Sequence, residues 1–544
     1  MLKILAMAVT ISVIIVSHIL CSPVYAQEPD IRWYTQNPQA EIFDISTADE
    51  LAGLAALVNG TAGLERGERS TRDIYHEWID GVEQSEVAVD FKGKTIRLIR
   101  DIDLSKYGYG SQFNKGNGWI PIGHCMADDK DDCGLIFEFN DDGTGRSNIT
   151  YFRGIFDGNG KTISGLYAKS EMGFDHAGDL MYVSGGIFGS VVSGTVRDLG
   201  IVGAKIIGEG GGGIVGMLTG GGSVLNSYFI GTIDIGYVGG GIVGLLQNGS
   251  VSNSYFTGTL SGDVVGGIVG VVGADHRGGA WGKGNISNCY SVGTINGNGN
   301  VGGIVGLLSG TNSSVSNCYS MGTINGYYGV GGIVGSLRGT NSSVSNCYSI
   351  ATINGKSSVG GIVGFVNNLS QTEEYIRIMG EFASGFFPKE LYYKKTEKIV
   401  LFDTIKNNVS NNVALNSHVK AIGSNINVSL VTPSEWLYEG CGSSSAIPYR
   451  APDSSFSRGG RIVGGSDAGI LSNNAAFSGI TNNTDNTAWD DRKATTINGE
   501  DITASTIKAD GTLGGRFTNE NGWTIQNGKL PGFGAPVDMP EHLR

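Results

Sequence analysis

The sequence predicts an all-β fold in which short strands stack as the coils of a β-solenoid. Glycine supplies 89 of the 544 residues and proline only 11, which favours many tight corners over a collagen-like or disordered chain. The segment Gly-Gly-Ile-Val-Gly recurs about every 28 residues without any helical periodicity. A unit this short cannot bury its own apolar face, so each unit is expected to stack on the next.

Residues 1–26 have the pattern of a secretory signal peptide. One positive charge at Lys3 precedes an apolar run from Ile4 to about Leu20, and small residues lead to a cut after Ala26. We therefore expect an exported protein, secreted or at the cell surface, with no membrane-spanning segment after cleavage. An uncleaved anchor and a lipid attached at Cys21 are the weaker alternatives.

Residues 27–184 are expected to contain an N-terminal cap and the first coils. Thr47-Ala-Asp-Glu50 is a capping box, and the apolar residues after it recur on one helical face up to Asn59-Gly60, which ends the pattern. A short amphipathic helix there would cover the open end of the first coil, whose strand edges would otherwise be unpaired.

Residues 185–364 form the clearest repeats. Gly-Gly-Ile-Val-Gly begins at Gly212, Gly240, Gly266, Gly302, Gly331 and Gly360, and a variant with Phe begins at Gly185. A second block supplies a Ser-Tyr or Cys-Tyr pair at Tyr228, Tyr255, Tyr290, Tyr319 and Tyr348. Because the side-chain period of a strand is two, the small residue and the tyrosine must point to opposite sides. We expect the Ser/Cys column inside and the tyrosine column outside.

An asparagine precedes each of these pairs, at Asn226, Asn253, Asn288, Asn317 and Asn346. Asparagine tolerates the left-handed backbone region, so each is predicted to lie at a corner of its coil. Beyond the repeats, residues 365–458 lose the period and are predicted to be an insertion out of the solenoid. Residues 459–544 are predicted to supply the last coils and a C-terminal cap.

Three blocks of the repeat, Gly-Gly-Ile-Val-Gly, Val-Ser-Asn-Cys-Tyr-Ser and Gly-Thr-Ile-Asn-Gly, resemble the GLUG repeat of bacterial secreted and surface proteins. That repeat occurs beside immunoglobulin A1-specific metallopeptidases. The flanks also resemble this group, at residues 45–54, 101–104, 119–123, 156–160, 412–416 and 461–464. The resemblance implies a right-handed parallel β-helix of the pectin-lyase-like type, and it implies no agreed activity.

The metallopeptidase activity itself is not predicted. A zinc peptidase of that type needs His-Glu-x-x-His on one helical face. The chain offers only His76-Glu-Trp-Ile-Asp80, with Asp where the second His should be. The other histidines are scattered, so a zinc site is unsupported.

Charge excludes further classes of function. The formal net charge of −13 makes the chain a poor partner for nucleic acid. Residues 185–364 contain only 11 charged residues in 180, whereas acid–base catalysis needs positioned titratable groups. A catalytic site on the central coils is therefore not expected.

The flanks hold the one candidate for catalysis, an acidic loop within residues 128–142. Its carboxylates are Asp128, Asp129, Asp131 and Asp132, with Asp141 and Asp142 nearby and Lys130 between them. These groups could bind Ca²⁺, or serve a polysaccharide lyase or hydrolase. Cys125 and Cys133 flank the loop and could close it as a disulfide in an oxidising compartment. A solvated acidic loop is the simpler interpretation.

The tyrosine column, residues 228, 255, 290, 319 and 348, is the candidate binding surface, because stacked rings with hydroxyl groups suit sugar rings or protein surfaces. A packing ladder is the simpler interpretation. The sequence therefore predicts a non-enzymatic adhesion or interaction module without a cofactor, whose partner is a glycan or a protein surface of the host or environment. The alternatives are a carbohydrate-active β-helix enzyme using the acidic loop, and a passive structural spacer.

Overall fold

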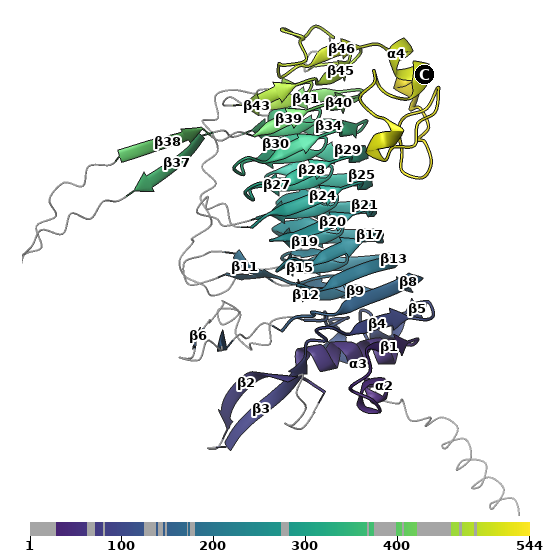
Figure 1. Ribbon diagram of the computed structural model, residues 1–544, viewed down its shortest axis with the longest axis vertical. Coiled ribbons are helices and arrows are strands. Elements are labelled where there is room, and N and C mark those ends of the chain that lie inside the picture. The colour runs from purple at the N-terminus through teal and green to yellow at the C-terminus, as the bar shows by residue number, and fades with distance from the viewer. Residues whose placement is uncertain are drawn as a thin grey trace, which may run out of the picture.

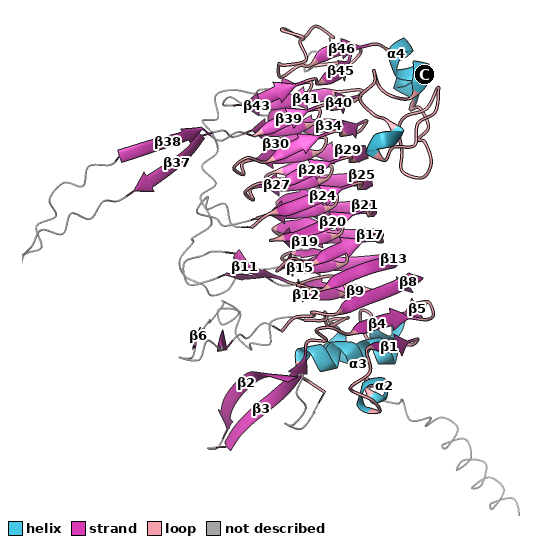
Figure 2. Ribbon diagram, in the orientation of Figure 1, coloured by secondary structure: helices cyan, strands magenta, loops and turns pink. Residues whose placement is uncertain are grey.

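The computed structural model is an elongated rod of stacked coils, with the N-terminal helices at one end and the last coils at the other (Figure 1). In the part of the chain that the structure describes, strands make up almost all of the rod, and the helices lie at its N-terminal end and beside its last coils (Figure 2). The structure describes residues 29–62, 71–79, 82–111, 113–123, 138–139, 145–146, 150–170, 172–174, 180–273, 282–366, 369–374, 399–404, 407–421, 459–466, 470–482 and 487–544. The predicted signal peptide lies outside the described residues.

Each coil contributes strands to three parallel sheets, which confirms the predicted right-handed parallel β-helix. In one coil, β16 (Ser223–Leu225) and β17 (Tyr228–Ile235) lie in a 23-stranded sheet. β18 (Val238–Gly240) joins a seven-stranded sheet and β19 (Val243–Leu246) an eight-stranded sheet. Each strand pairs with its equivalent one coil later, so that Tyr228 lies opposite Tyr255. The sequence repeat and the coil are therefore the same unit.

The other parallel strands of the rod belong to the same three sheets. The 23-stranded sheet also contains β1 (Ile42–Ile45), β4 (Thr95–Leu98), β5 (Ile102–Asp103), β8 (Ile155–Ser164), β9 (Tyr167–Ser170), β13 (Thr195–Gly208), β20 (Gly249–Ser252), β21 (Tyr255–Gly262), β24 (Gly284–Ser287), β25 (Tyr290–Gly297), β28 (Ser314–Ser316), β29 (Tyr319–Asn325), β32 (Ser343–Ser345), β33 (Tyr348–Ser349), β34 (Thr352–Gly355), β39 (Asn408–Ser410), β40 (Val413–Ala414), β41 (Val419–Ala421), β44 (Ile470–Ser472), β45 (Ala475–Phe477) and β46 (Glu500–Ile502). The seven-stranded sheet adds β14 (Gly211–Gly212), β22 (Val264–Gly266), β26 (Val301–Gly302), β30 (Tyr328–Gly331), β35 (Ser357–Gly360) and β42 (Gly459–Gly460). The eight-stranded sheet adds β12 (Phe188–Val192), β15 (Val215–Thr219), β23 (Val269–Val272), β27 (Val305–Leu308), β31 (Val334–Leu337), β36 (Val363–Val366) and β43 (Val463–Ser466).

The Gly-Gly-Ile-Val-Gly segment is the corner between the seven-stranded and the eight-stranded sheet. Its isoleucine, Ile214 in the first full copy, is completely buried in the interior of the coil. A Cβ atom on Gly213 would meet the carbonyl oxygen of Gly241 in the next coil well inside contact distance. The second glycine is therefore required by the close approach of two coils, because only glycine leaves room for the neighbouring backbone.

The asparagine corners are confirmed. Asn226, Asn253, Asn288, Asn317 and Asn346 all have left-handed backbones, with φ between 49° and 55°. Their side chains also bond from coil to coil, because Asn288 Nδ2 donates to Asn253 Oδ1 at 3.1 Å and Asn317 Nδ2 donates to Asn288 Oδ1 at 3.2 Å. The corner column is thus an amide ladder along the rod.

The N-terminal capping helix is confirmed, but it is not amphipathic, because every residue from Leu51 to Asn59 is buried. α3 (Ala48–Asn59) begins at the Thr47 capping box, ends at Gly60 with φ 78°, and buries Leu51 and Leu54 completely. It lies at the N-terminal end of the rod with the short helix α2 (Arg32–Thr35) and the first strand, β1 (Figure 1). The helix therefore covers the coil end that the sequence left open.

Antiparallel hairpins stand outside the coils. They are β2 (Thr71–Ile79) with β3 (Val82–Val89), β6 (Glu138–Phe139) with β7 (Gly145–Arg146), β10 (Met172–Phe174) with β11 (Leu180–Val183), and β37 (Leu369–Glu374) with β38 (Ile399–Thr404). The last of these projects from the side of the rod (Figure 1).

The predicted insertion at residues 365–458 needs correction. β36, which ends at Val366, still belongs to the eight-stranded sheet, and residues 407–421 return to the solenoid, where β39, β40 and β41 pair in parallel with β32, β33 and β34. The sequence repeat did not reveal this coil, because Val413 stands at its tyrosine position. Its Gly-Gly corner comes only at Gly460, after a second interruption of the repeat.

The C-terminal segment departs from a simple end cap. α4 (Ala504–Asp510), the short helical turns at Asn519–Asn521 and Glu541–Leu543, and the loops between them lie beside the last coils (Figure 1). The series of Gly-Gly corners ends with Arg461, which replaces the second glycine and is completely buried. Its guanidinium donates to the carbonyl oxygens of Asn498 and Gly499, both at 2.9 Å, and to Asp501 at 2.7 Å. A bulky side chain fits there because no further Gly-Gly corner stacks on Arg461.

Candidate functional site

The tyrosine column forms one continuous stack of five rings on the outside of the coil. Successive ring centroids are 4.7–5.1 Å apart, and successive planes differ by only 2–8°. The alternating residues Ser227, Ser254, Cys289, Cys318 and Cys347 are buried in the coil interior. The predicted orientation, small residues inside and tyrosines outside, is therefore correct.

Neighbouring rings are stacked in parallel with a sideways offset, so each ring covers only part of the next. Carbon atoms in contact lie about 3.5–4 Å apart, so parallel rings with centroids near 4.9 Å apart must be displaced sideways by roughly 3 Å, the offset arrangement that aromatic pairs prefer. The first ring, Tyr228, extends over Gly200 of the preceding coil, where a Cβ atom would collide with the ring. Glycine at this position lets the stack begin with a ring lying along the sheet.

The last two rings are covered by the C-terminal segment. Tyr319 is 6% exposed and Tyr348 is fully buried, whereas the first three rings are only partly buried. The ring of Trp523 lies 5.7 Å from that of Tyr348, and the ring of Phe533 lies 5.7 Å from that of Tyr319. The hydroxyl of Tyr348 donates to the carbonyl oxygen of Pro531 at 2.6 Å. The surface therefore has an open part and an occupied part.

The acidity of the phenols follows the same division. Burial raises the pKa of Tyr255, and it raises the pKa of Tyr290 to about 12, with a further contribution from the neighbouring ring. The pKa values of Tyr319 and Tyr348 are raised further by the same cause, burial. All of these phenols are neutral hydrogen-bonding groups at physiological pH.

The strip beside the open rings is almost uncharged. Outward-pointing neighbours on the same strands are Ile230, Thr232 and Asp234 in β17, Thr257, Thr259 and Ser261 in β21, and Val292, Thr294 and Asn296 in β25. Since each column repeats at the coil spacing of about 4.8 Å, the strip offers aromatic, aliphatic and hydroxyl groups in parallel rows.

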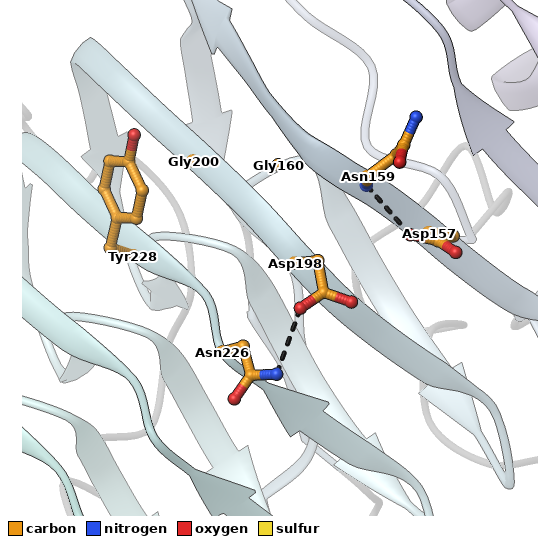
Figure 3. Close-up of a pocket in the computed structure, with 7 residues that line it drawn as sticks. All are labelled: Asp157, Asn159, Gly160, Asp198, Gly200, Asn226 and Tyr228. Atoms are coloured by element: carbon orange, nitrogen blue, oxygen red, sulfur yellow. Dashed lines mark hydrogen bonds between the residues drawn. The ribbon is translucent and has the colours of Figure 1, made fainter. Parts of the chain in front are cut away.

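A pocket of 320 Å³ lies at the N-terminal end of the tyrosine stack (Figure 3). Its walls come from three successive coils: Asp157, Asn159 and Gly160 in β8, Asp198 and Gly200 in β13, and Asn226 and Tyr228 at the next corner. Asn226 Nδ2 donates to Asp198 Oδ1 at 3.0 Å, and the backbone N–H of Asn159 donates to Asp157 Oδ1 at 2.8 Å. The pocket thus combines carboxylates, amides and one aromatic ring.

Alternating charges lead to this pocket from the N-terminal coils. Asp44, Arg97, Asp157 and Arg197 lie opposite one another on successive strands. The guanidinium of Arg97 bonds to Asp44 at 2.8 Å, and that of Arg197 bonds to Asp157 at 2.8 Å and lies 3.8 Å from Asp198. One cation among two carboxylates leaves the pocket with a net negative charge.

Several predicted sites lie outside the described residues. These are the acidic loop with Asp128, Asp129, Asp131 and Asp132, its possible Ca²⁺ site, and the Cys125–Cys133 disulfide. His76 and Glu77, the incomplete peptidase motif, lie in strand β2 instead of on a helix, so the local structure that a zinc peptidase motif requires is absent from this segment. Among the described residues, no helix is long and apolar enough to cross a bilayer.

Sequence reasoning missed the pocket and the cover on the last two rings. The cover had a signal, the aromatic cluster Phe517, Trp523 and Phe533 in a segment without the repeat, but the sequence did not indicate which surface would receive it. The pocket had a weaker signal, which was Gly200 and Asp198 standing where later coils have tyrosine and asparagine.

No family model matches the sequence, and no curated protein matches it. One solved structure is similar, described as "a putative immunoglobulin A1 protease from Bacteroides ovatus". The two chains share 14% sequence identity with a TM-score of 0.38, over 91% of this chain and 92% of the other. Similarity at this level carries no statement about activity, and the GLUG assignment stays a resemblance in the sequence.

Proposed function

We propose that this protein is an exported, non-catalytic interaction module that binds glycans through the open part of the tyrosine stack. The observation that supports this most is the stack itself. The rings of Tyr228, Tyr255 and Tyr290 are only partly buried. Each ring overlaps the next with an offset that leaves part of one face uncovered. Rows of threonine hydroxyls lie beside them. Offset aromatic faces bind the apolar C–H faces of sugars, and hydroxyl groups bond to sugar hydroxyls.

The site is suited to binding more than to catalysis. Most of the strip is uncharged, and a general acid–base pair needs titratable groups close to the reacting bond. The carboxylate of Asp157 is already bonded to Arg197. A carbohydrate-active enzyme using the acidic loop within residues 128–142 stays the alternative, and a passive spacer is the second alternative.

A glycan array probed with the purified protein tests the proposal. The variant Tyr228→Ser/Tyr255→Ser/Tyr290→Ser removes the open rings, and Tyr237→Ser is the matched control because Tyr237 is 49% exposed outside the stack. We expect the wild type and the control to be retained on the same glycans and the triple variant to lose retention. Equal retention of all three proteins would place binding elsewhere, and no retention of any would leave the spacer.

Release of new reducing or unsaturated ends from the retained glycans tests the enzymatic alternative. A protein that only binds releases none. Release that is lost in the Asp128→Asn/Asp129→Asn/Asp131→Asn/Asp132→Asn variant would establish the enzyme and contradict the proposal.

A further inference from the structure

The pocket beside Tyr228 differs from the rest of the strip in shape and chemistry. Tyr255, Tyr290 and Tyr319 each have a stacked ring on both sides, but Tyr228 has one only on its C-terminal side. On the other side the ring lies over Gly200, and beyond it Gly160 has no side chain and no atom packed against its Cβ position, so a hollow is left beside the ring (Figure 3). The strip therefore ends, at Tyr228, in a shallow pocket that is open to solvent.

The volume of the hollow limits its occupant. At 320 Å³ it lies at the lower end of the range of about 300–1,000 Å³ that ligand pockets span. This is room for one small cyclic ligand and not for a folded peptide segment or a cofactor of nucleotide size.

The polar groups of the pocket are mainly acceptors. The carboxylates of Asp157 and Asp198 and the amide oxygen of Asn226 can each accept hydrogen bonds from a ligand. Asn226 Nδ2 is already committed to Asp198, and Asn159 Nδ2 is committed to the carbonyl oxygen of Leu98 at 3.1 Å. A matching ligand must therefore donate several hydrogen bonds from one face and present an apolar face to Tyr228.

Charge narrows the class of ligand further. The lining residues include two acidic side chains and no basic one, and the partly exposed Arg197 beside them is engaged by Asp157 and Asp198. A carboxylate, sulfate or phosphate on the ligand would face like charges, which is unfavourable. Hydroxyl donors without a formal charge fit this lining.

We infer that the pocket binds one neutral hexopyranose unit of a glycan, with its hydroxyls bonded to Asp198 and Asn226 and its C–H face on the ring of Tyr228. The inference rests on the proposed function and assigns that function an anchoring subsite. Because the coil spacing of about 4.8 Å is close to the length of one sugar unit, the following units lie over Tyr255 and Tyr290. The C-terminal segment on Tyr319 then ends the binding strip.

Calorimetric titration with neutral oligosaccharides of one to six units tests the subsite. The probes are linear series of glucose, mannose, galactose and N-acetylglucosamine, with oligogalacturonate as the acidic counterpart. We expect at least one neutral series to bind, with affinity rising up to about three or four units and levelling afterwards. Absence of binding by every neutral series, or preferential binding of oligogalacturonate, would overturn the inference.

The variant Asp198→Asn tests the subsite without disturbing the coil. Asp198 has a left-handed backbone with φ 53° and accepts the ladder hydrogen bond of Asn226, and asparagine occupies the same corner in the next five coils. We expect an at least tenfold loss of affinity for mono- and disaccharides with an unchanged melting temperature. Tyr290→Ser, outside the pocket, is the matched control and should weaken only the longer oligosaccharides.

The outcomes separate the inference from the proposed function. Loss of glycan retention in the Tyr255→Ser and Tyr290→Ser variants with full retention in Asp198→Asn would overturn the subsite and leave the tyrosine strip standing. Loss of short-oligosaccharide binding in Asp198→Asn and Tyr228→Ser, with Tyr290→Ser unaffected, would establish the subsite.

Discussion

The two ends of the tyrosine stack have the same covalent repeat and different surroundings. At the N-terminal end Tyr228 borders a pocket and is partly exposed, whereas at the C-terminal end Tyr348 is fully buried and donates a hydrogen bond to Pro531. The rings themselves are stacked alike throughout. A repeat therefore determines the position of each side chain, and the segment packed on it determines whether that side chain binds a partner or stabilises the fold.

The occupied end also shows what the stack can hold. The C-terminal segment places two aromatic rings, Trp523 and Phe533, on Tyr319, and its backbone accepts a bond from Asn317 Nδ2 at 3.2 Å through Asn521. Contact of an apolar face with the rings is also what we propose for a glycan at the open end, although the glycan there donates hydrogen bonds instead of accepting them.

Removing an aromatic side chain of the C-terminal segment that covers Tyr319 and Tyr348 should cause the largest loss of stability. Trp523→Ala deletes a side chain that is 2% exposed and packs against Tyr348, Phe517 and Phe533, so the free energy of unfolding should fall by about 3–5 kcal/mol. Urea denaturation measures the loss, with Tyr237→Ala as the control. A loss below about 1 kcal/mol would mean that the cover is not packed on the stack.

Alkaline pH should loosen the covered end before the open one. The pKa of Tyr290 is about 12 and those of Tyr319 and Tyr348 are higher, against about 10 in an unfolded chain. Above pH 10 the unfolded chain therefore loses phenolic protons that the folded chain retains, so stability present below pH 10 declines as the pH rises through 12.

To check this order, phenolate formation is followed by ultraviolet absorbance and unfolding by circular dichroism over the same pH range. Tyr319→Phe/Tyr348→Phe should flatten the decline of stability between pH 10 and 12. A decline of the same steepness in this variant would assign the alkaline sensitivity to other tyrosines.

Deleting single hydroxyl groups should change the free energy of unfolding by different amounts at the two ends of the stack, and by less than Trp523→Ala does. Tyr348→Phe leaves the buried carbonyl of Pro531 without the bond that it accepts at 2.6 Å, so it should cost about 1–3 kcal/mol. Tyr228→Phe removes a hydroxyl at the partly exposed end and should change stability by less than about 0.5 kcal/mol. Equal effects in denaturant unfolding would contradict the division of the stack.

The smallest effect is expected inside the coil, beneath the stack. Cys318→Ser converts the interior column to the residue that earlier coils use, where the Ser227 hydroxyl donates to the carbonyl oxygen of Leu225 at 2.7 Å. The Cys318 thiol already points at the equivalent carbonyl oxygen of Ser316, 3.1 Å away. We expect a loss of about 1 kcal/mol or less in thermal unfolding, and a larger loss would show that the interior volume differs between coils.

Much of this architecture could be predicted from the chain alone. The period in Gly-Gly-Ile-Val-Gly determined the solenoid, because a 28-residue unit with glycine corners has no other way to bury its isoleucines. The alternation of Cys318 and Tyr319 determined which side chain faces the coil interior and which faces outward. Asn317 determined where the backbone of the coil turns. Each of these features depends on residues close in sequence or repeated at one period.

The tertiary structure alone decided which part of the surface is available. The bond from Tyr348 to Pro531 joins residues 183 positions apart, and no local pattern specifies that a segment without the repeat will pack on two particular rings. The pocket likewise exists only because Gly160, Gly200 and Tyr228 from three successive coils become neighbours. Local periodicity determines where a side chain points, but its exposure depends on the segment that packs against it.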